Sequence, residues 1–178
     1  MQGFQNRSQK LERLAQFYAE RAKGGVGLII TGGFSPNSAG TLYPLGSKLD
    51  SSFERDCHRI VTQQVRDNSV RGYSYPNYSP YAHVMETKEI KDEFTTMEDY
   101  ETKICLQILH AGRYAAHPFA VSSTDQKSPI SPFPPKKLGA SGVESTIRDF
   151  VGCAEFAKEA GYHGVEIMGS GKSLWEKW

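Results

Sequence analysis

The sequence predicts an α/β fold built on a parallel sheet. Three short runs are apolar along nearly their whole length: VGLIIT at 26–31, KICLQIL at 103–109 and HGVEIM at 163–168. Each run follows a stretch with the spacing of an amphipathic helix. Strands of this kind, alternating with helices, are typical of a parallel sheet whose faces are covered.

The first helix is predicted before residue 26. Apolar residues recur there at the intervals of one helix face, namely Leu11, Leu14, Ala15, Tyr18 and Ala22. Gly24-Gly25 follows and can adopt the left-handed conformation that ends many helices.

Two further helices precede the second and third strands. Ser51 and Glu54 have the spacing of a capping box, so a helix is expected to begin there. Its predicted face is Phe53, Cys57, Ile60, Val61 and Gln64. The third helix is predicted to bury Ile147, Phe150, Val151, Ala154 and Ala157, with Gly161 as its cap.

Residues 66–102 interrupt this order. The connection from a helix to the next strand usually takes a few residues. This one is rich in Tyr, Ser and Pro and then acidic, without a sustained period. We interpret it as a disordered insertion, which is either a tolerated surface loop or sequence that does not belong to the mature protein.

Composition excludes several classes of partner. The 178 residues are 38% hydrophobic and 23% charged, with a net charge of +1, so neither a nucleic acid nor a membrane surface is expected as a partner. No apolar run approaches the roughly 20 residues of a membrane span. The three cysteines are widely separated and no metal spacing is present. We expect a cytoplasmic protein, with a mitochondrial location left open.

The candidate site lies where the strands end, because ligands of parallel sheets bind there. Gln107 carries an amide that could pair with a ring bearing adjacent N–H and C=O groups, or with a neighbouring loop backbone. Gly33 would let the backbone approach a flat ligand, or would simply form a turn. His110 and Arg113 could support a substrate or pin their loop.

The segment MGSGKS near the end of the chain is similar to a phosphate-binding loop, but it fails the pattern. That pattern requires glycine five positions before the Gly-Lys-Ser, where this chain has Glu166. We therefore do not expect a nucleotide triphosphatase.

Three segments together resemble the flavin-dependent Old Yellow Enzyme family: ERLAQFYAERAKGGVGLIITGG, KICLQILHAGRY and AKEAGYHGVEIMGS. The ending Met168-Gly169-Ser170 resembles the 2,4-dienoyl-CoA reductase branch. The resemblance implies a partial TIM (β/α)8 barrel of about three βα units, in which residues 1–178 form one incomplete domain.

The resemblance also implies chemistry. Gln107 would contact the pyrimidine ring of FMN and Gly33 would touch the same cofactor. The family passes hydride from NADPH to FMN and then to an electron-poor C=C bond, here of an enoyl or dienoyl substrate. The iron–sulfur cysteines of full-length relatives are not found in this chain, and no oligomeric state is predicted.

The chain departs from the family at its ends. The family's first strand should precede residue 11, and its proton-donating tyrosine should lie in a Gly-Tyr-Leu stretch. The chain instead reads Gly171-Lys172-Ser173-Leu174, so no catalytic residue is assigned and 171–178 is interpreted as a non-family tail. The alternative is a catalytically inactive truncated or misassembled chain, or a half-barrel that binds a partner.

Overall fold

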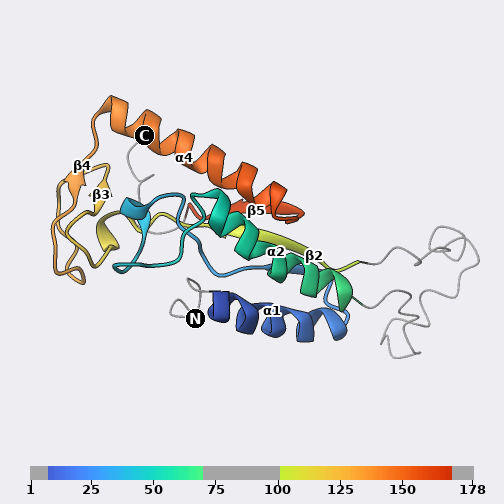
Figure 1. Cartoon of the computed structure of the whole chain (residues 1–178). Coiled ribbons are helices and arrows are strands. Elements are labelled where there is room, and N and C mark those ends of the chain that lie inside the picture. Colours follow the sequence, from blue (N-terminus) through green and yellow to red (C-terminus); the bar gives the residue numbers. More distant parts are fainter. Residues whose placement is uncertain (1–7, 70–100, 170–178) are drawn as a thin grey trace, which may run out of the picture.

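A computed structural model describes residues 8–69 and 101–169 of the chain. It contains a three-stranded parallel sheet in the order β1-β2-β5, formed by Leu28–Ile30, Lys103–Ile108 and Gly164–Ile167. Three long helices accompany it: α1 (Ser8–Lys23), α2 (Ser52–Asp67) and α4 (Ala140–Glu159) (Figure 1). The predicted α/β class is therefore confirmed.

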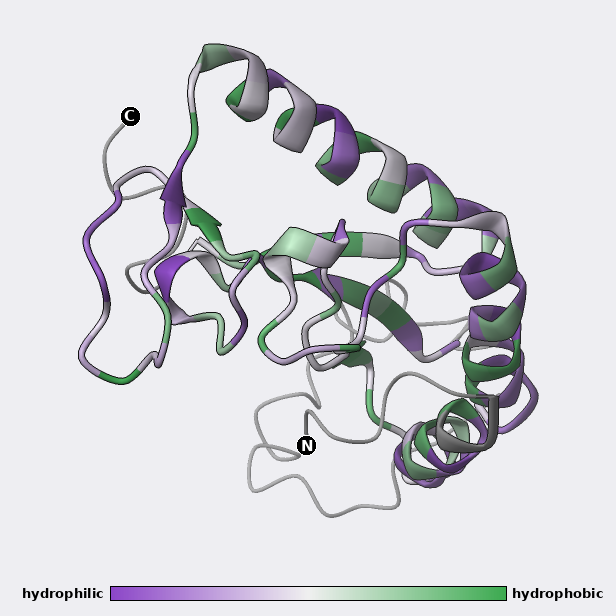
Figure 2. Cartoon of the chain, turned by 60° about the vertical axis from the view of Figure 1, so that its left-hand side comes forward, coloured by the Kyte–Doolittle hydropathy of each residue, from purple (hydrophilic) through white to green (hydrophobic). Residues whose placement is uncertain are grey.

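The helices cover one face of the sheet. Ile104, Leu106 and Ile108 of β2 are fully buried in one core cluster with residues of α1, α2 and α4. Figure 2 shows the helices curving around one side of the strands. The other face carries Leu28 and Ile30, which are 54% and 48% exposed. Within 8–69 and 101–169, the sheet thus has one covered face, whereas the sequence predicted strands covered on both.

Helix α1 follows its prediction. The five residues assigned to its inner face are all at most 6% exposed: Leu11, Leu14, Ala15, Tyr18 and Ala22. Gly25 has a φ of 77° and its N–H donates to the carbonyl of Ala22 at 3.0 Å, so the helix ends as the Gly-Gly pair predicts.

The predicted buried face of α2 is confirmed for Val61 and, in part, for Cys57, which packs against the core, and is wrong for Phe53 and Ile60. Ser51 does cap the helix, since its side chain accepts from the N–H of Glu54. However, Phe53 and Ile60 are 75% and 36% exposed. The buried residues of the helix are His58, Val61, Thr62 and Val65. Two polar residues lie inside because each has a buried partner: His58 Nδ1 is 2.9 Å from Tyr162 Oη and Thr62 Oγ1 is 2.6 Å from the Ala160 carbonyl oxygen.

The prediction for α4 is confirmed for Phe150 and Ala157, and Ala154 packs against the core, but it is wrong for two residues. Ile147 and Val151 are 47% and 54% exposed, while Thr146, Phe150, Cys153 and Ala157 are buried. Thr146 tolerates burial because its hydroxyl donates to the carbonyl of Gly142 at 2.9 Å. Gly161, the predicted cap, has a φ of 91°, which favours glycine.

A second, smaller unit follows β2. It contains the short helix η4 (Gly112–Tyr114) and a two-stranded parallel sheet of β3 (Val121–Ser122) and β4 (Lys136–Lys137). A further short helix, η2 (Ser38–Gly40), lies in the loop after β1. These elements come from long loops at the carboxyl ends of the strands.

Most of the predicted insertion lies outside the described residues, as does the predicted tail at 171–178. At the edges of the insertion the chain is regular: α2 extends to Asp67, and Thr102 is buried with its hydroxyl donating to the carbonyl of Val26 at 2.7 Å. Residues 66, 67 and 102 therefore belong to the folded part.

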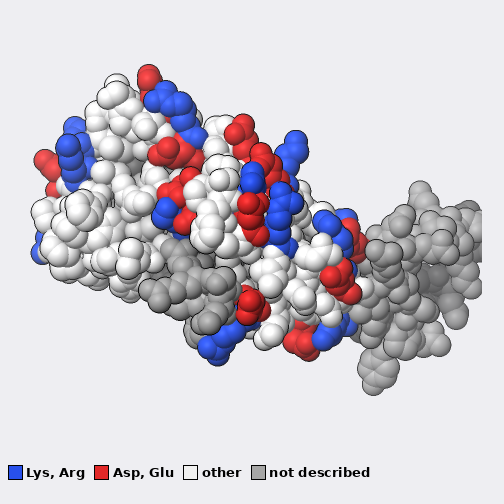
Figure 3. All heavy atoms as spheres, in the orientation of Figure 1, with Lys and Arg blue, Asp and Glu red and all other residues white. Residues whose placement is uncertain are grey.

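Charged side chains of both signs alternate over the helices (Figure 3). One pair joins α2 to α4, with Arg55 Nη1 2.6 Å from Glu159 Oε2. No helix in the described part of the chain is long and apolar enough to cross a membrane.

Candidate functional site

A bulge shapes the carboxyl end of β1. Ile30 pairs with Cys105, but the next pair along the ladder is Phe34 with Ile108. Four steps of one chain therefore face three steps of the other, which is the definition of a β-bulge. The additional residue lies in the segment that contains Gly32 and Gly33, and the backbone of Gly33 lies close to β2.

Gly33 and Gln107 are brought together by this bulge. A Cβ atom added to Gly33 would lie 2.6 Å from Leu109 Cβ and 3.2 Å from Gln107 Oε1. The site therefore has no room for a side chain at position 33. The N–H of Gly33 has no acceptor among the described residues, so it is available as a donor beside the amide.

The backbone of Gln107 is held by hydrogen bonds, whereas its side-chain amide forms none in the described residues. The main-chain N–H donates to Thr31 Oγ1 at 3.0 Å, and the carbonyl accepts from Phe34 at 2.9 Å. The half-buried amide of the side chain forms no hydrogen bond within residues 8–69 and 101–169. The pairing to a loop backbone that we considered as an alternative is thus not observed in that part of the chain.

His110 is a buried residue in a tight setting. Its Nδ1 accepts from the N–H of Gly112 at 3.1 Å, so the hydrogen of the neutral ring is on Nε2, which has no described partner. Burial, followed by the charge of His117, lowers the pKa of His110 to about 4. The ring stacks on Phe150, with centroids 6.4 Å apart, and lies against Gly40. These contacts hold the loop in place, and the role of His110 toward a substrate stays a prediction.

His117 has the complementary arrangement. Its Nε2 donates to the carbonyl of Thr41 at 2.8 Å, and its buried Nδ1 also lacks a partner among the described residues. The two histidines tie the loop after β2 to the loop after β1, where Gly33 lies.

Arg113 lies on η4 with its Nε buried and without a described partner. Its guanidinium carbon is 5.6 Å from the centre of the Tyr114 ring. No hydrogen bond joins Arg113 or His110 to Gln107 in the described part of the chain. The predicted residues therefore separate into a contacting pair, Gly33 and Gln107, and two loop residues.

Glu166 was missed at the sequence level as a site residue. It pairs in register with Gln107, and one of its carboxylate oxygens, Oε2, is buried without a partner among the described residues. The signal was present in HGVEIM, where a single acidic residue stands between Val165 and Ile167. Alternation along a strand places it on the face opposite those two.

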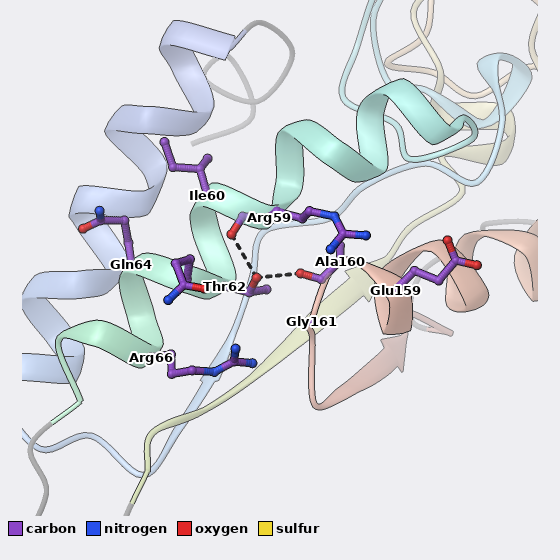
Figure 4. Close-up of a pocket in the computed structure, with 9 residues that line it drawn as sticks. Arg59, Ile60, Thr62, Gln64, Arg66, Glu159, Ala160 and Gly161 are labelled. Carbon is purple, nitrogen blue, oxygen red and sulfur yellow. Dashed lines mark hydrogen bonds between the residues drawn. The ribbon is translucent and has the colours of Figure 1, made fainter.

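A hollow of about 370 Å³ lies elsewhere, between α2 and the end of α4 (Figure 4). Thr62 closes its floor through hydrogen bonds to the carbonyls of Arg59 and Ala160. Arg66 on its rim pairs with Glu101, which lies just before β2 begins. The hollow is thus at the end of the sheet opposite Gly33, and we do not assign the site to it.

Comparison with known proteins identifies the family. The model of the NADH:flavin oxidoreductase / NADH oxidase family matches residues 80–177, which is more than half of the chain. The chain belongs to this family. The chain is 27% identical over 175 residues to a metal reductase of Desulforamulus reducens, and 27% identical over 168 residues to an NADH oxidase of Thermoanaerobacter brockii.

Similar solved structures show the fold of the chain. Morphinone reductase superposes with a TM-score of 0.63 at 17% identity, over 91% of this chain and 40% of that one. The Old Yellow Enzyme homologue of Zymomonas mobilis gives 0.62 at 19% identity, over 94% and 40%. The described residues are therefore part of a (β/α) barrel, as predicted. The chain spans about a fifth of the length of the two curated relatives, which it matches over 94% and 89% of its own length.

Family membership implies a flavin cofactor, and the residues at the strand ends fit one. A flat ring with neighbouring C=O and N–H groups needs close backbone approach, a free N–H and an unpaired amide. Gly33 provides the first two and Gln107 the third. No group of three or more His, Cys, Asp or Glu suited to a metal ion occurs in the described residues.

Proposed function

We propose that this chain forms the pyrimidine side of the FMN site in a flavin-dependent oxidoreductase of the ene-reductase type. The observation that carries this proposal is the unpaired amide of Gln107 lying against Gly33, at the carboxyl edge of the sheet. Family membership supports the flavin, and the donor and acceptor groups at this edge match the ring.

When bound, FMN would supply hydride transfer. The chain's own part is recognition and placement. The N–H of Gly33 would donate to a ring carbonyl, while the Gln107 amide would accept from the ring N–H and donate to the other carbonyl. The bulge keeps side chains away from the ring plane, and the hydrogen bonds of Gln107 to Thr31 and Phe34 hold the strand in place.

The finer assignment rests on the resemblance of Met168-Gly169-Ser170. It favours NADPH as the reductant and an activated C=C bond of a 2,4-dienoyl-CoA-like substrate. No catalytic proton donor is assigned, because the chain has Gly171-Lys172-Ser173-Leu174 where the family's tyrosine would stand.

A second candidate function is a non-catalytic half-barrel that binds a partner. The uncovered sheet face favours it, since Leu28 and Ile30 are about half exposed there. Ile167 of the edge strand β5 is 56% exposed on the other face. Apolar strand residues of this kind are usually covered in a folded assembly.

Flavin titration separates the two. We expect riboflavin and FMN to bind the chain weakly and with similar affinity, because the described contacts reach only the ring. Gln107→Leu should weaken both by about tenfold, as expected for a lost hydrogen-bonded pair. The control is Gln16→Leu on the exposed side of α1. Equal binding by Gln107→Leu and the unaltered chain would contradict the proposal.

Activity tests the second candidate. On the half-barrel account, the purified chain does not reduce a dienoyl-CoA with NADPH. A yellow preparation that NADPH bleaches would contradict the half-barrel account and support the flavin-dependent oxidoreductase.

A further inference from the structure

A carboxylate shares the uncovered face of the sheet with Gln107. Glu166 of β5 pairs in register with Gln107 of β2, and neighbours in register point to the same face of a parallel sheet. The row before them consists of Ile30, Cys105 and Gly164, which offers no charge. Glu166 is therefore the acidic group beside the glutamine.

This carboxylate is not satisfied by the described part of the fold. Its Oε2 is buried and has no hydrogen-bond partner among the described residues. A buried acceptor without a donor costs free energy. Such a group does not serve the fold alone, which points to a role toward a ligand.

Cations near this face do not neutralise Glu166 in the described residues. Lys103 shares the face, but it lies at the start of β2, with its Nζ 3.1 Å from Glu101 Oε2. Arg113 follows β2, and no ion pair joins it to Glu166 in the described residues. Within residues 8–69 and 101–169, no cation therefore pairs with Glu166 beside Gln107.

We propose that Glu166 tunes the redox balance of the flavin that Gln107 and Gly33 bind, an inference that rests on the proposed function. When bound, the flavin would take a hydride, which is two electrons and one proton, from a reduced nicotinamide, and the nicotinamide would be oxidised. The product ring is an anion unless a second proton follows. A nearby carboxylate repels that anion and leaves the neutral oxidised ring almost unaffected. Glu166 would thus favour transfer of the hydride from the reduced flavin to the substrate.

The test compares both redox forms of one ligand. Riboflavin, oxidised or reduced with dithionite, is titrated anaerobically into the chain at alkaline pH, where the reduced ring is an anion. Glu166→Gln should tighten binding of the reduced form relative to the oxidised form by about tenfold. Glu155→Gln, on the exposed side of α4, should leave the ratio unchanged.

The outcomes are distinguishable. If Glu166→Gln changes both affinities equally, or neither, the residue has a structural role and the inference is wrong. If the unaltered chain binds neither form, the proposed function itself fails and the inference fails with it. Circular dichroism on each variant establishes that the fold is retained.

Discussion

Position 33 is the residue on which the geometry of the site depends most. The bulge brings its Cα so close to β2 that a methyl group would meet Leu109 Cβ at 2.6 Å. That contact involves the base of a side chain beside a strand, so it cannot be relieved by rotating a flexible end. The N–H of Gly33, which has no acceptor among the described residues, is the group that would donate to the ring in the proposed function.

Gly33→Ala should therefore both destabilise the chain and weaken flavin binding. The overpacking cost is roughly 1–3 kcal/mol in the free energy of unfolding, measured by urea titration. Gly139→Ala is the matched control, because an added Cβ there meets nothing within 4 Å. Equal stability of the two variants would contradict the described position of Leu109.

Buried histidines make the stability depend on pH. Burial lowers the pKa of His58 from 6.5 to about 4, and burial together with His117 does the same for His110. Between these values the unfolded chain binds protons that the folded chain excludes. Stability is therefore greatest above pH 6.5 and is lost as the pH falls toward 4, by about 1.4 kcal/mol per pH unit for each group.

The contribution of His58 can be isolated. His58→Asn keeps a nitrogen near the position of Nδ1 for Tyr162 but removes the titrating ring. We expect this variant to be less stable at neutral pH, because of the cavity, and to lose stability less steeply on acidification. Urea titrations at several pH values measure both. An unchanged slope would show that His58 does not titrate in this range.

At the scale of elements, the sequence located the helices well but misjudged part of the buried faces of α2 and α4. Helix α1 has a clear apolar stripe, and all its predicted residues are buried. In α2 and α4 large apolar residues lie on more than one side, so hydrophobicity alone selected Phe53 and Val151 wrongly. The true faces include polar residues, such as Thr62, whose partners come from distant segments and could not be read from local spacing.

The burial pattern of α4 predicts a contrast between neighbouring residues. Phe150→Ala should cost about 3–5 kcal/mol in the free energy of unfolding, since its ring is 6% exposed in the core. Val151→Ala, at a position that is 54% exposed, should cost under about 1 kcal/mol. Urea titrations of the two variants measure the difference, and similar costs would restore the face predicted from sequence.

The site shows the same division between what was predictable and what was not. Gly33 and Gln107 could be paired from sequence because each stands at the carboxyl end of a predicted strand. Their contact requires the bulge, which changes the pairing register between the strands by one residue. In the sequence, the bulge is indicated only by the two glycines at 32 and 33. Glu166 escaped attention because its importance comes from its register with Gln107, and register between distant strands is not visible in a single sequence.

At the scale of the whole molecule, the described residues are a barrel segment with an open side. Three parallel strands carry helices on one face, and the proposed ligand edge lies on the other, at the carboxyl ends. The partial barrel was expected from the resemblance and is confirmed by superposition on solved relatives over about two fifths of their length. Substrate and reductant remain proposals at this scale.

The central claim is that the Gln107 amide and the Gly33 N–H bind the edge of a flavin ring. Titration of the ¹⁵N-labelled chain with riboflavin, followed by NMR, tests it even when binding is weak. The account predicts saturable shifts of the Gly33 backbone amide and the Gln107 side-chain amide, with Gly139 unmoved. Shifts confined to Gly161 and Thr62 in the hollow between α2 and α4, or no shifts at all, would contradict it.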